Sequence, residues 1–206
     1  MAIKLAIFDF DGTLADTYPL FMDSLDVLAA THGFRRLACH ERQRLRGLSA
    51  TEVIRELQLP LWKVPAVLSD FRKIMRRRID EARLFSGMAS VLCAMVQKDI
   101  KVAIATSNSI DNVRAILGDP LLSRFAMLEC GSTLFGKSHR LRRILKKTEV
   151  MRAQAIYIGD EIRDAEAAKK MGISFGAVAW GYTDVDVLLR TNPFKVFRTP
   201  TDILAI

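Results

Sequence analysis

Four groups of polar residues follow apolar stretches of the sequence, at points where buried strands would end. The stretch LAIFDFDGTLADT carries Asp9 and Asp11 at the end of an apolar run, with Gly12 directly after them. Thr106, Ser107 and Asn108 follow KVAIA, and Lys137 follows LFG. The last group, Asp160, Glu161 and Asp164, follows AIYIG. Ligands bind beyond the carboxyl ends of the strands in an open parallel sheet, so these residues are candidates for a functional site.

The residue types in these groups predict a site that binds Mg²⁺ and phosphate. Neighbouring carboxylates raise one another's pKa unless a cation lies among them. Mg²⁺ prefers hard oxygen ligands such as a few carboxylates, and it keeps part of its water shell. A lysine, a hydroxyl group and backbone amides at strand ends are donors that bind a phosphate.

Short apolar runs predict the strands that position these groups. They are residues 3–10, 100–106, 125–129, 155–160 and 173–180, with the sequences IKLAIFDF, IKVAIAT, FAMLE, AIYIGD and ISFGAVAW. From residue 86 onward they alternate with stretches of helical apolar spacing, such as MASVLCAMV, SIDNVRAIL and IRDAEAAKKMG. This alternation predicts an α/β fold, a doubly wound parallel sheet with helices on both faces.

Residues 15–84 have a different pattern, with consecutive helices and no convincing strand. YPLFMDSLDVLAATHG places apolar residues on one face and ends at Gly33. SATEVIRELQLP begins with a Ser/Thr-type cap and ends at Pro60, and VPAVLSDFRKIMRRRIDEA carries a single apolar stripe. An all-helical segment after the first strand predicts a small helical domain inserted into the α/β core.

Four motifs carry a resemblance to a known family. DFDGTLADT, IATSNS, GKS and IGDEIRD resemble, in order and spacing, the motifs of the haloacid dehalogenase superfamily of phosphohydrolases. RGLSATEVIREL and AWGYTDVDVLL are similar to its phosphoglycolate phosphatase and β-phosphoglucomutase branch. The resemblance spans nearly the whole chain. It implies a Rossmann-like α/β core formed by residues 1–14 and 85–206, with a helical cap at residues 15–84.

The resemblance also implies roles for the acids. Asp9 is the expected nucleophile, which attacks phosphorus to form an aspartyl-phosphate. Mg²⁺ is expected to be bound by Asp9, by the backbone carbonyl of Asp11 and by Asp160, and Asp164 binds it through water or orients its ligands. Asp11 is the expected general acid, which protonates the leaving alkoxide and then acts as base for the hydrolytic water.

The remaining motif residues are expected to bind the phosphate. By resemblance, the hydroxyl of Thr106 and the amide of Ser107 bind the transferring phosphoryl oxygens, and Lys137 neutralises their charge. Asn108 and Gly12 are included among the predicted phosphate-binding residues.

Plainer interpretations stay open for four of these positions. Thr106 and Asn108 are also typical turn residues, and Lys137 alone would be a surface lysine. Ser138 and His139 stand where this branch often has prolines after the lysine. Asp164 could also be an ordinary acid in the first turn of a helix, where it interacts with the helix dipole.

Arg46 and Gly47 lie where the branch places a substrate-specificity loop in the cap. We expect that Arg46 binds a second anionic group on the substrate. The alternative is a solvated arginine beside a turn glycine, and the sequence does not favour either interpretation.

The leading functional hypothesis is a Mg²⁺-dependent phosphoric monoester hydrolase that acts on a small phosphorylated metabolite and resembles phosphoglycolate phosphatase. Dehalogenases of the superfamily lack the second acid, Asp11, so dehalogenation is disfavoured. A phosphosugar mutase of the β-phosphoglucomutase type uses the same aspartyl-phosphate and remains an alternative. A non-catalytic regulatory or binding protein on the same fold is the alternative of another class, but it would be expected to have lost Asp9, Asp11 or Asp160.

Composition limits the other function classes. The chain of 206 residues has a net charge of +8, from 31 Lys and Arg against 23 Asp and Glu, but it contains no nucleic-acid motif. Its three cysteines, Cys39, Cys93 and Cys130, are widely separated and predict reduced thiols. The apolar runs are too short to span a bilayer. We expect a cytoplasmic protein, a monomer or homodimer, with neither nucleic acid nor membrane as partner.

Overall fold

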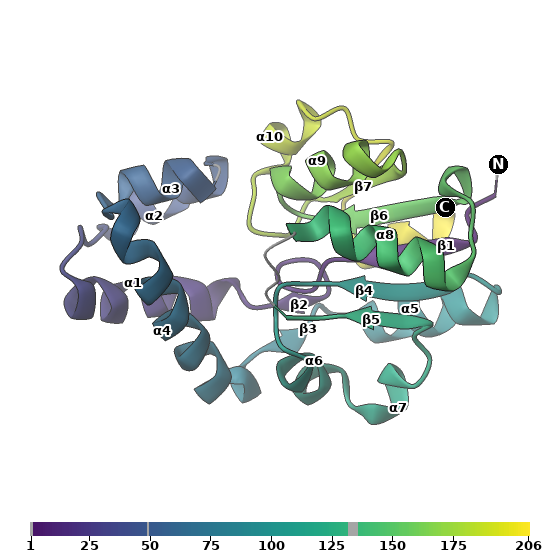
Figure 1. Ribbon diagram of the computed structural model, residues 1–206, viewed down its shortest axis with the longest axis horizontal. Helices are drawn as coiled ribbons and strands as arrows, with labels where there is room; N and C mark the ends of the chain where they lie inside the picture. Colours follow the sequence, from purple (N-terminus) through teal and green to yellow (C-terminus); the bar gives the residue numbers. More distant parts are fainter. Residues whose placement is uncertain (1, 49, 132–135) are drawn as a thin grey trace.

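The computed structural model describes residues 2–48, 50–131 and 136–206. Its main sheet has six parallel strands in the order β5-β4-β1-β6-β7-β8 (Figure 1). The strands are β1 Leu5–Phe8, β4 Lys101–Ala105, β5 Met127–Glu129, β6 Ala155–Gly159, β7 Ser174–Val178 and β8 Lys195–Phe197. The predicted parallel sheet and α/β class are confirmed, and β8 is a strand that the apolar pattern does not predict.

Helices cover both faces of this sheet, because successive strand residues point to opposite sides. Ala6 and Phe8 of β1 belong to one core cluster, whose helical members come from α5, α6, α7 and η5. Leu5 and Ile7 belong to the other, with members from α8, α9 and α10, and Figure 1 shows α8 and α9 in front of the sheet. The bounds are α5 Met88–Gln97, α6 Ile110–Leu117, α7 Asp119–Leu122, α8 Gly136–Thr148, η4 Arg152–Gln154, α9 Ile162–Met171, α10 Val185–Leu189 and η5 Pro200–Ala205.

The segment between β1 and α5 is helical, as predicted, and forms its own core cluster, which includes Leu25, Leu28 and Val67. In Figure 1 its four α-helices lie to the left of the sheet. Its elements are α1 Tyr18–His32, α2 Cys39–Arg42, η1 Gln43–Gly47, α3 Ala50–Glu56, η2 Leu61–Lys63, α4 Val64–Arg77 and η3 Ile79–Glu81. The exact division into core and cap domains stays a prediction.

Two very short strands enclose this helical segment. β2 Ala15–Asp16 pairs antiparallel with β3 Arg83–Leu84. The expectation that residues 15–84 contain no strand is therefore wrong at both ends. Strands of two residues are too short to show alternation in the sequence, so no pattern reveals them.

Local signals explain where several helices end. Gly33 ends α1 with a φ of 66°, and Gly172 ends α9 with a φ of 65°, a left-handed conformation that glycine adopts without strain. Helix α3 ends at Glu56, four residues before Pro60. The predicted Ser/Thr-type cap of α3 includes Ser49, which lies outside the described residues.

Within the described ranges, no helix combines the length and apolar character needed to cross a bilayer. Cys93 and Cys130 are free thiols.

Candidate active site

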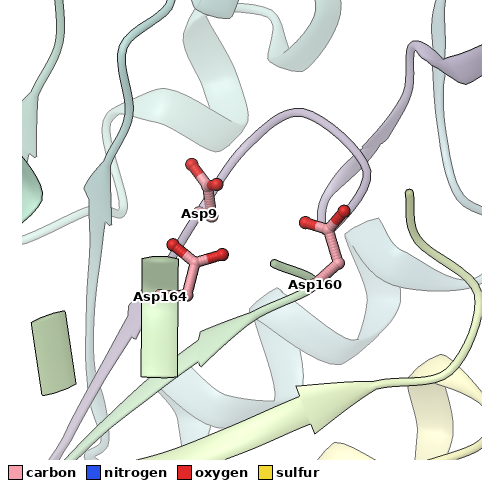
Figure 2. Close-up of side chains that lie close together, drawn as sticks. All are labelled: Asp9, Asp160 and Asp164. Carbon is pink, nitrogen blue, oxygen red and sulfur yellow. The ribbon is translucent and has the colours of Figure 1, made fainter. Parts of the chain in front are cut away.

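The sheet brings three buried acids together at one edge. β1 lies between β4 and β6, so Asp9 and Asp160 follow neighbouring strands. Asp164 joins them from the first turn of α9. Each acid offers one carboxylate oxygen, and these three oxygens lie within 4.8 Å of one another. Figure 2 shows Asp160 facing Asp9 and Asp164 across the space between them.

A tight turn after β1 presents the first acid. The backbone amide of Asp9 donates to the carbonyl of Ile158 at 2.9 Å, which continues the pairing of β1 with β6. The amide of Phe10 then donates to Asp9 Oδ1 at 2.8 Å. Gly12 has a φ of 73°, and a Cβ atom there would lie 2.3 Å from Asp160 Oδ2. Glycine is therefore required both by the backbone and by the close approach of Asp160.

Asp160 is fully buried and is oriented by two residues distant in sequence. The Thr13 hydroxyl donates to Oδ1 at 2.7 Å, and the Tyr182 amide donates to Oδ2 at 2.8 Å. A Cβ atom on Gly181 would lie 2.1 Å from the Cβ of Asp160, so the loop after β7 packs directly on it. Sequence reasoning did not assign roles to Thr13, Gly181 or Tyr182, although all three lie in motifs it quoted.

Asp164 lies in the first turn of α9 and uses both of its carboxylate oxygens, while its expected role at the metal stays a prediction. Its Oδ2 accepts the amide of Glu161 at 3.0 Å, which caps α9. Its Oδ1 accepts the hydroxyl of Tyr157 at 2.9 Å and also contacts Lys137. A Cβ atom on Gly159 would lie 2.5 Å from Asp164 Oδ2, so the end of β6 and this carboxylate are in close contact.

Lys137 lies in the first turn of α8 and is buried, unlike an ordinary surface lysine. Its Nζ donates to Asp9 Oδ2 and to Asp164 Oδ1, and lies 3.6 Å from Glu161 Oε2. Burial lowers the pKa of Lys137, but the Asp164 and Asp9 carboxylates more than offset this and hold it above its usual value. The lysine therefore stays protonated among the acids.

One lysine does not neutralise the three acids. Burial raises the pKa of Asp9 to about 7, although Lys137 opposes this change and Asp164 adds to it. Burial also raises the pKa of Asp160 well above its usual value, and the neighbouring Glu161 and Asp9 add to the increase. A divalent cation among these oxygens would compensate this concentration of negative charge, so the donor set fits a hard metal ion.

Asp11 is half-buried and has a different set of partners. The Asn108 amide donates to its Oδ1 at 3.0 Å and its Oδ2 at 3.1 Å, and the Thr17 hydroxyl donates to Oδ1 at 3.1 Å. Burial raises the pKa of Asp11, and these bonds from Thr17 and Asn108 partly lower it. A raised pKa suits a carboxyl group that donates a proton, a question that the sequence leaves open.

The predicted phosphate-binding residues follow β4. Thr106 is buried, and its hydroxyl oxygen accepts the amide of Asn108 at 3.0 Å. Ser107 and Lys137 line the same cavity, which has a volume of about 500 Å³. The structure thus brings Ser107 beside Lys137, whereas the Asn108 side chain donates to both carboxylate oxygens of Asp11.

Arg46 lies in a different cavity, of about 510 Å³, together with Tyr18 and Asp184. Its guanidinium carbon lies 4.2 Å from the centre of the Tyr18 ring, and its backbone carbonyl accepts the amide of Asp184 at 2.6 Å. Gly47 is exposed, and a Cβ atom on it would have no neighbour within 4 Å. Substrate recognition by Arg46 and Gly47 stays a prediction.

Comparisons with known proteins agree with this geometry. The family of haloacid dehalogenase-like hydrolases matches residues 6–178. The phosphoglycolate phosphatase of Synechococcus elongatus is 30% identical over 203 residues, which cover 98% of this chain and 96% of that protein. The phosphoglycolate phosphatase of Agrobacterium fabrum is 31% identical over 200 residues, which cover 89% of this chain and 84% of that protein.

A solved structure has the same fold. A hydrolase of the haloacid dehalogenase-like family from Streptococcus pneumoniae matches with a TM-score of 0.83 at 21% identity, and the match covers 98% of this chain and 97% of that one. The resemblance expected from the motifs is confirmed, and so is the prediction of a phosphoric monoester hydrolase.

Proposed function

Because this chain belongs to the family of haloacid dehalogenase-like hydrolases, we propose that it is a Mg²⁺-dependent phosphatase with Asp9 as nucleophile. The observation that carries the proposal is the buried group of Asp9, Asp160 and Asp164 around Lys137, at the carboxyl end of a parallel sheet. Its substrate is a small phosphorylated metabolite. Phosphoglycolate is the first candidate, because the two relatives described above are named phosphoglycolate phosphatase.

The metal would be held by the carboxylates of Asp9 and Asp160 and, as the family resemblance implies, by the backbone carbonyl of Asp11, while Asp164 would bind it through water or orient its ligands. Phosphatases of this family generally use a divalent metal, and Mg²⁺ suits an all-oxygen donor set. When bound, it supplies positive charge that offsets the repulsion between a carboxylate and a phosphate ester. Thr13 and Tyr182 keep Asp160 in position.

Asp9 and Asp11 divide the chemistry between them. A carboxylate oxygen of Asp9 attacks phosphorus, the bond to the ester oxygen breaks, and Asp11 gives its proton to the departing alkoxide. Asp11 is then a carboxylate and accepts a proton from water, whose oxygen attacks the same phosphorus. The bond from Asp9 to phosphorus breaks, and inorganic phosphate leaves.

Lys137, Thr106 and Ser107 bind the transferring phosphoryl group. The protonated Lys137 neutralises charge on its oxygens, and the Ser107 amide and Thr106 hydroxyl donate hydrogen bonds to them. Support for this assignment comes from the burial of Lys137 and from the cavity that it shares with Ser107.

Residues 15–84 serve as a cap in this proposal. Their separate core cluster and the short β2–β3 ribbon at their base are consistent with an inserted domain. Tyr182 stacks on Phe21 of α1, with ring centres 5.6 Å apart, and its hydroxyl lies 2.8 Å from the Thr17 hydroxyl. The loop that holds Asp160 is therefore also in contact with the helical segment.

Phosphate release from a panel of phosphorylated metabolites tests the function. We expect Mg²⁺-dependent release from one class of substrate by the wild type and none by Asp9→Asn, because an amide of nearly the same shape is a very poor nucleophile. Circular dichroism and thermal melting verify that the variant is folded.

Two results would contradict the proposal. Isomerised sugar phosphate without free phosphate would indicate the phosphosugar mutase instead. Binding of a metabolite without any turnover, by a folded protein, would indicate the regulatory alternative.

A further inference from the structure

We propose that a basic groove at the N-terminus of α8 binds a second anionic group of the substrate, a carboxylate or a second phosphate, and that Arg72 and Arg140 select for it. The inference rests on the phosphatase function proposed above. It restricts the substrates to phosphoesters that carry another negative charge.

The groove is the cavity of about 500 Å³ described above, and it continues from the phosphate-binding residues. Ser107 and Lys137 lie in its wall, so the groove opens directly beside residues proposed to bind the phosphate. Five of the described lining residues are basic, and Glu166 is the one acid among them. The basic residues are Arg72, Lys137, Arg140, Arg163 and Lys170.

Arg140 is the member that points most directly to a missing anion. Its side chain is only 2% exposed, and its Nε has no hydrogen-bond partner among the described residues. Its Nη2 donates to the carbonyl of Gly131, a neutral group. No carboxylate within the described part of the chain forms an ion pair with it. Burial lowers the pKa of Arg140, and the Asp9 and Glu129 carboxylates, which form no ion pair with it, only partly oppose this. A bound anion would supply a negative charge in direct contact and the acceptor that Nε lacks.

Two other cations of the groove are already paired. Lys137 is bound to Asp9 and Asp164, and Arg163 contacts Glu161. Arg140 is therefore distinct from both, because no acid within the described residues forms an ion pair with it. Helix α8 has no acid in its first turn, so the backbone amides and partial positive charge at its N-terminus add to the attraction for an anion.

Arg72 approaches the groove from the helical segment. It lies on α4, whereas Arg140 lies on α8, so the groove is lined by both parts of the chain. The exposed guanidinium of Arg72 is thus placed to contact the far end of a substrate bound at Lys137. Arg46 lines the other cavity, so Arg46 and Arg72 lie at different cavities.

Paired substrates test the selection. Phosphoglycolate is compared with hydroxyethyl phosphate, which lacks the carboxylate, and a hexose bisphosphate is compared with the hexose monophosphate. We expect the wild type to prefer the doubly anionic member of one pair, and the pair that shows this preference identifies a carboxylate or a phosphate as the second group. In Arg72→Gln the preference, measured as a ratio of kcat/KM values, should fall about tenfold or more, chiefly through KM.

Two further variants sharpen the comparison. Arg77→Gln removes an exposed arginine of the same helix that is not part of the groove lining, and it should keep the wild-type preference. Arg140→Lys keeps the positive charge but loses Nε, and it should lower the preference in the same direction as Arg72→Gln. The inference would be overturned if Arg72→Gln lowered kcat/KM equally for both members of a pair. It would also be overturned if the wild type did not prefer the doubly anionic member of either pair.

Binding without turnover separates this inference from the proposed function. Thermal-shift titrations of Asp9→Asn with each pair report affinity even if the wild type hydrolyses nothing. Tighter binding of phosphoglycolate or of the bisphosphate, reduced by adding Arg72→Gln, supports the groove whatever the reaction is. Equal binding of both members of each pair contradicts it, even if phosphatase activity is found.

Discussion

Four aspartates of this site are alike in the sequence and differ in their surroundings. Asp9 is paired with a lysine, whereas Asp11 accepts hydrogen bonds from two neutral side chains, Thr17 and Asn108. The first arrangement favours a carboxylate that can act as a nucleophile, and the second favours a carboxyl group that exchanges a proton. The environment of each acid, and not its residue type, therefore assigns its role.

Asn108→Ala should shift the pH dependence of the reaction. The Asn108 amide stabilises the charged form of Asp11, so its removal raises the pKa of Asp11 further. The general acid must be protonated, so activity falls as pH rises through this pKa. The alkaline limb of the pH profile for kcat should therefore move to higher pH. Thr17→Val should move it in the same direction, and an unmoved or lowered limb in both variants would remove Asp11 from the role of acid.

Residue types at strand ends could be predicted, but the contacts that orient them could not. Asp9, Asp160 and Lys137 follow clear apolar runs, so their position at the edge of the sheet follows from local pattern. The bond from Thr13 to Asp160 joins residues 147 positions apart, and such a contact leaves no periodic signal in the sequence. For the same reason nothing local indicates that Arg140 is buried beside the site.

At the scale of elements, the turn after β1 and the loop after β7 act together on Asp160. Gly12 and Gly181 allow both segments to approach this side chain so closely that a Cβ atom would overlap it. The strands alone bring the acids to one edge, and these two connections fix the carboxylate of Asp160 relative to Asp9. We therefore expect the geometry of the metal site to depend on residues that hold no metal.

Gly12→Ala tests this dependence. Its Cβ would lie 2.3 Å from Asp160 Oδ2, so Asp160 must move, and the affinity for Mg²⁺ should fall by about tenfold or more. The left-handed backbone should also cost about 1–3 kcal/mol of folding free energy. Mg²⁺ dependence of activity and chemical denaturation measure the two effects.

Gly172→Ala is the matched control, because its φ is 65° and a Cβ atom there has no neighbour within 4 Å. It should lose comparable stability and keep the wild-type affinity for Mg²⁺. A similar loss of Mg²⁺ affinity in both variants would show that backbone strain, and not contact with Asp160, is responsible.

At the scale of the whole molecule, the helical segment and the α/β part both contribute residues to the cavity beside Lys137. The sequence predicts both parts from their periodicity, since long amphipathic helices and buried strands have distinct patterns. It does not predict the two-residue strands β2 and β3. It also does not predict that Arg72 lines one cavity and Arg46 the other. Those features depend on how the two parts are packed against each other.

Metal binding should stabilise the whole fold. The three grouped carboxylates of Asp9, Asp160 and Asp164 form a site only in the folded state, so Mg²⁺ at about a hundred times its Kd should add ~2.7 kcal/mol to the free energy of unfolding. Differential scanning calorimetry with Mg²⁺ and with EDTA measures this shift.

Asp160→Asn should abolish most of the shift while the protein remains at least as stable as the metal-free wild type, because it removes a buried carboxylate whose pKa is raised. An equal thermal shift in this variant would mean that Mg²⁺ binds elsewhere.

The most direct test of the central claim is to trap the covalent intermediate. The wild type is mixed with its best substrate and Mg²⁺, quenched in acid within one turnover, digested and analysed by mass spectrometry. We predict one phosphoryl group on the peptide that contains Asp9, and none in Asp9→Asn. A phosphoryl group on another residue, or rapid release of phosphate with no labelled peptide at any time, would contradict the account.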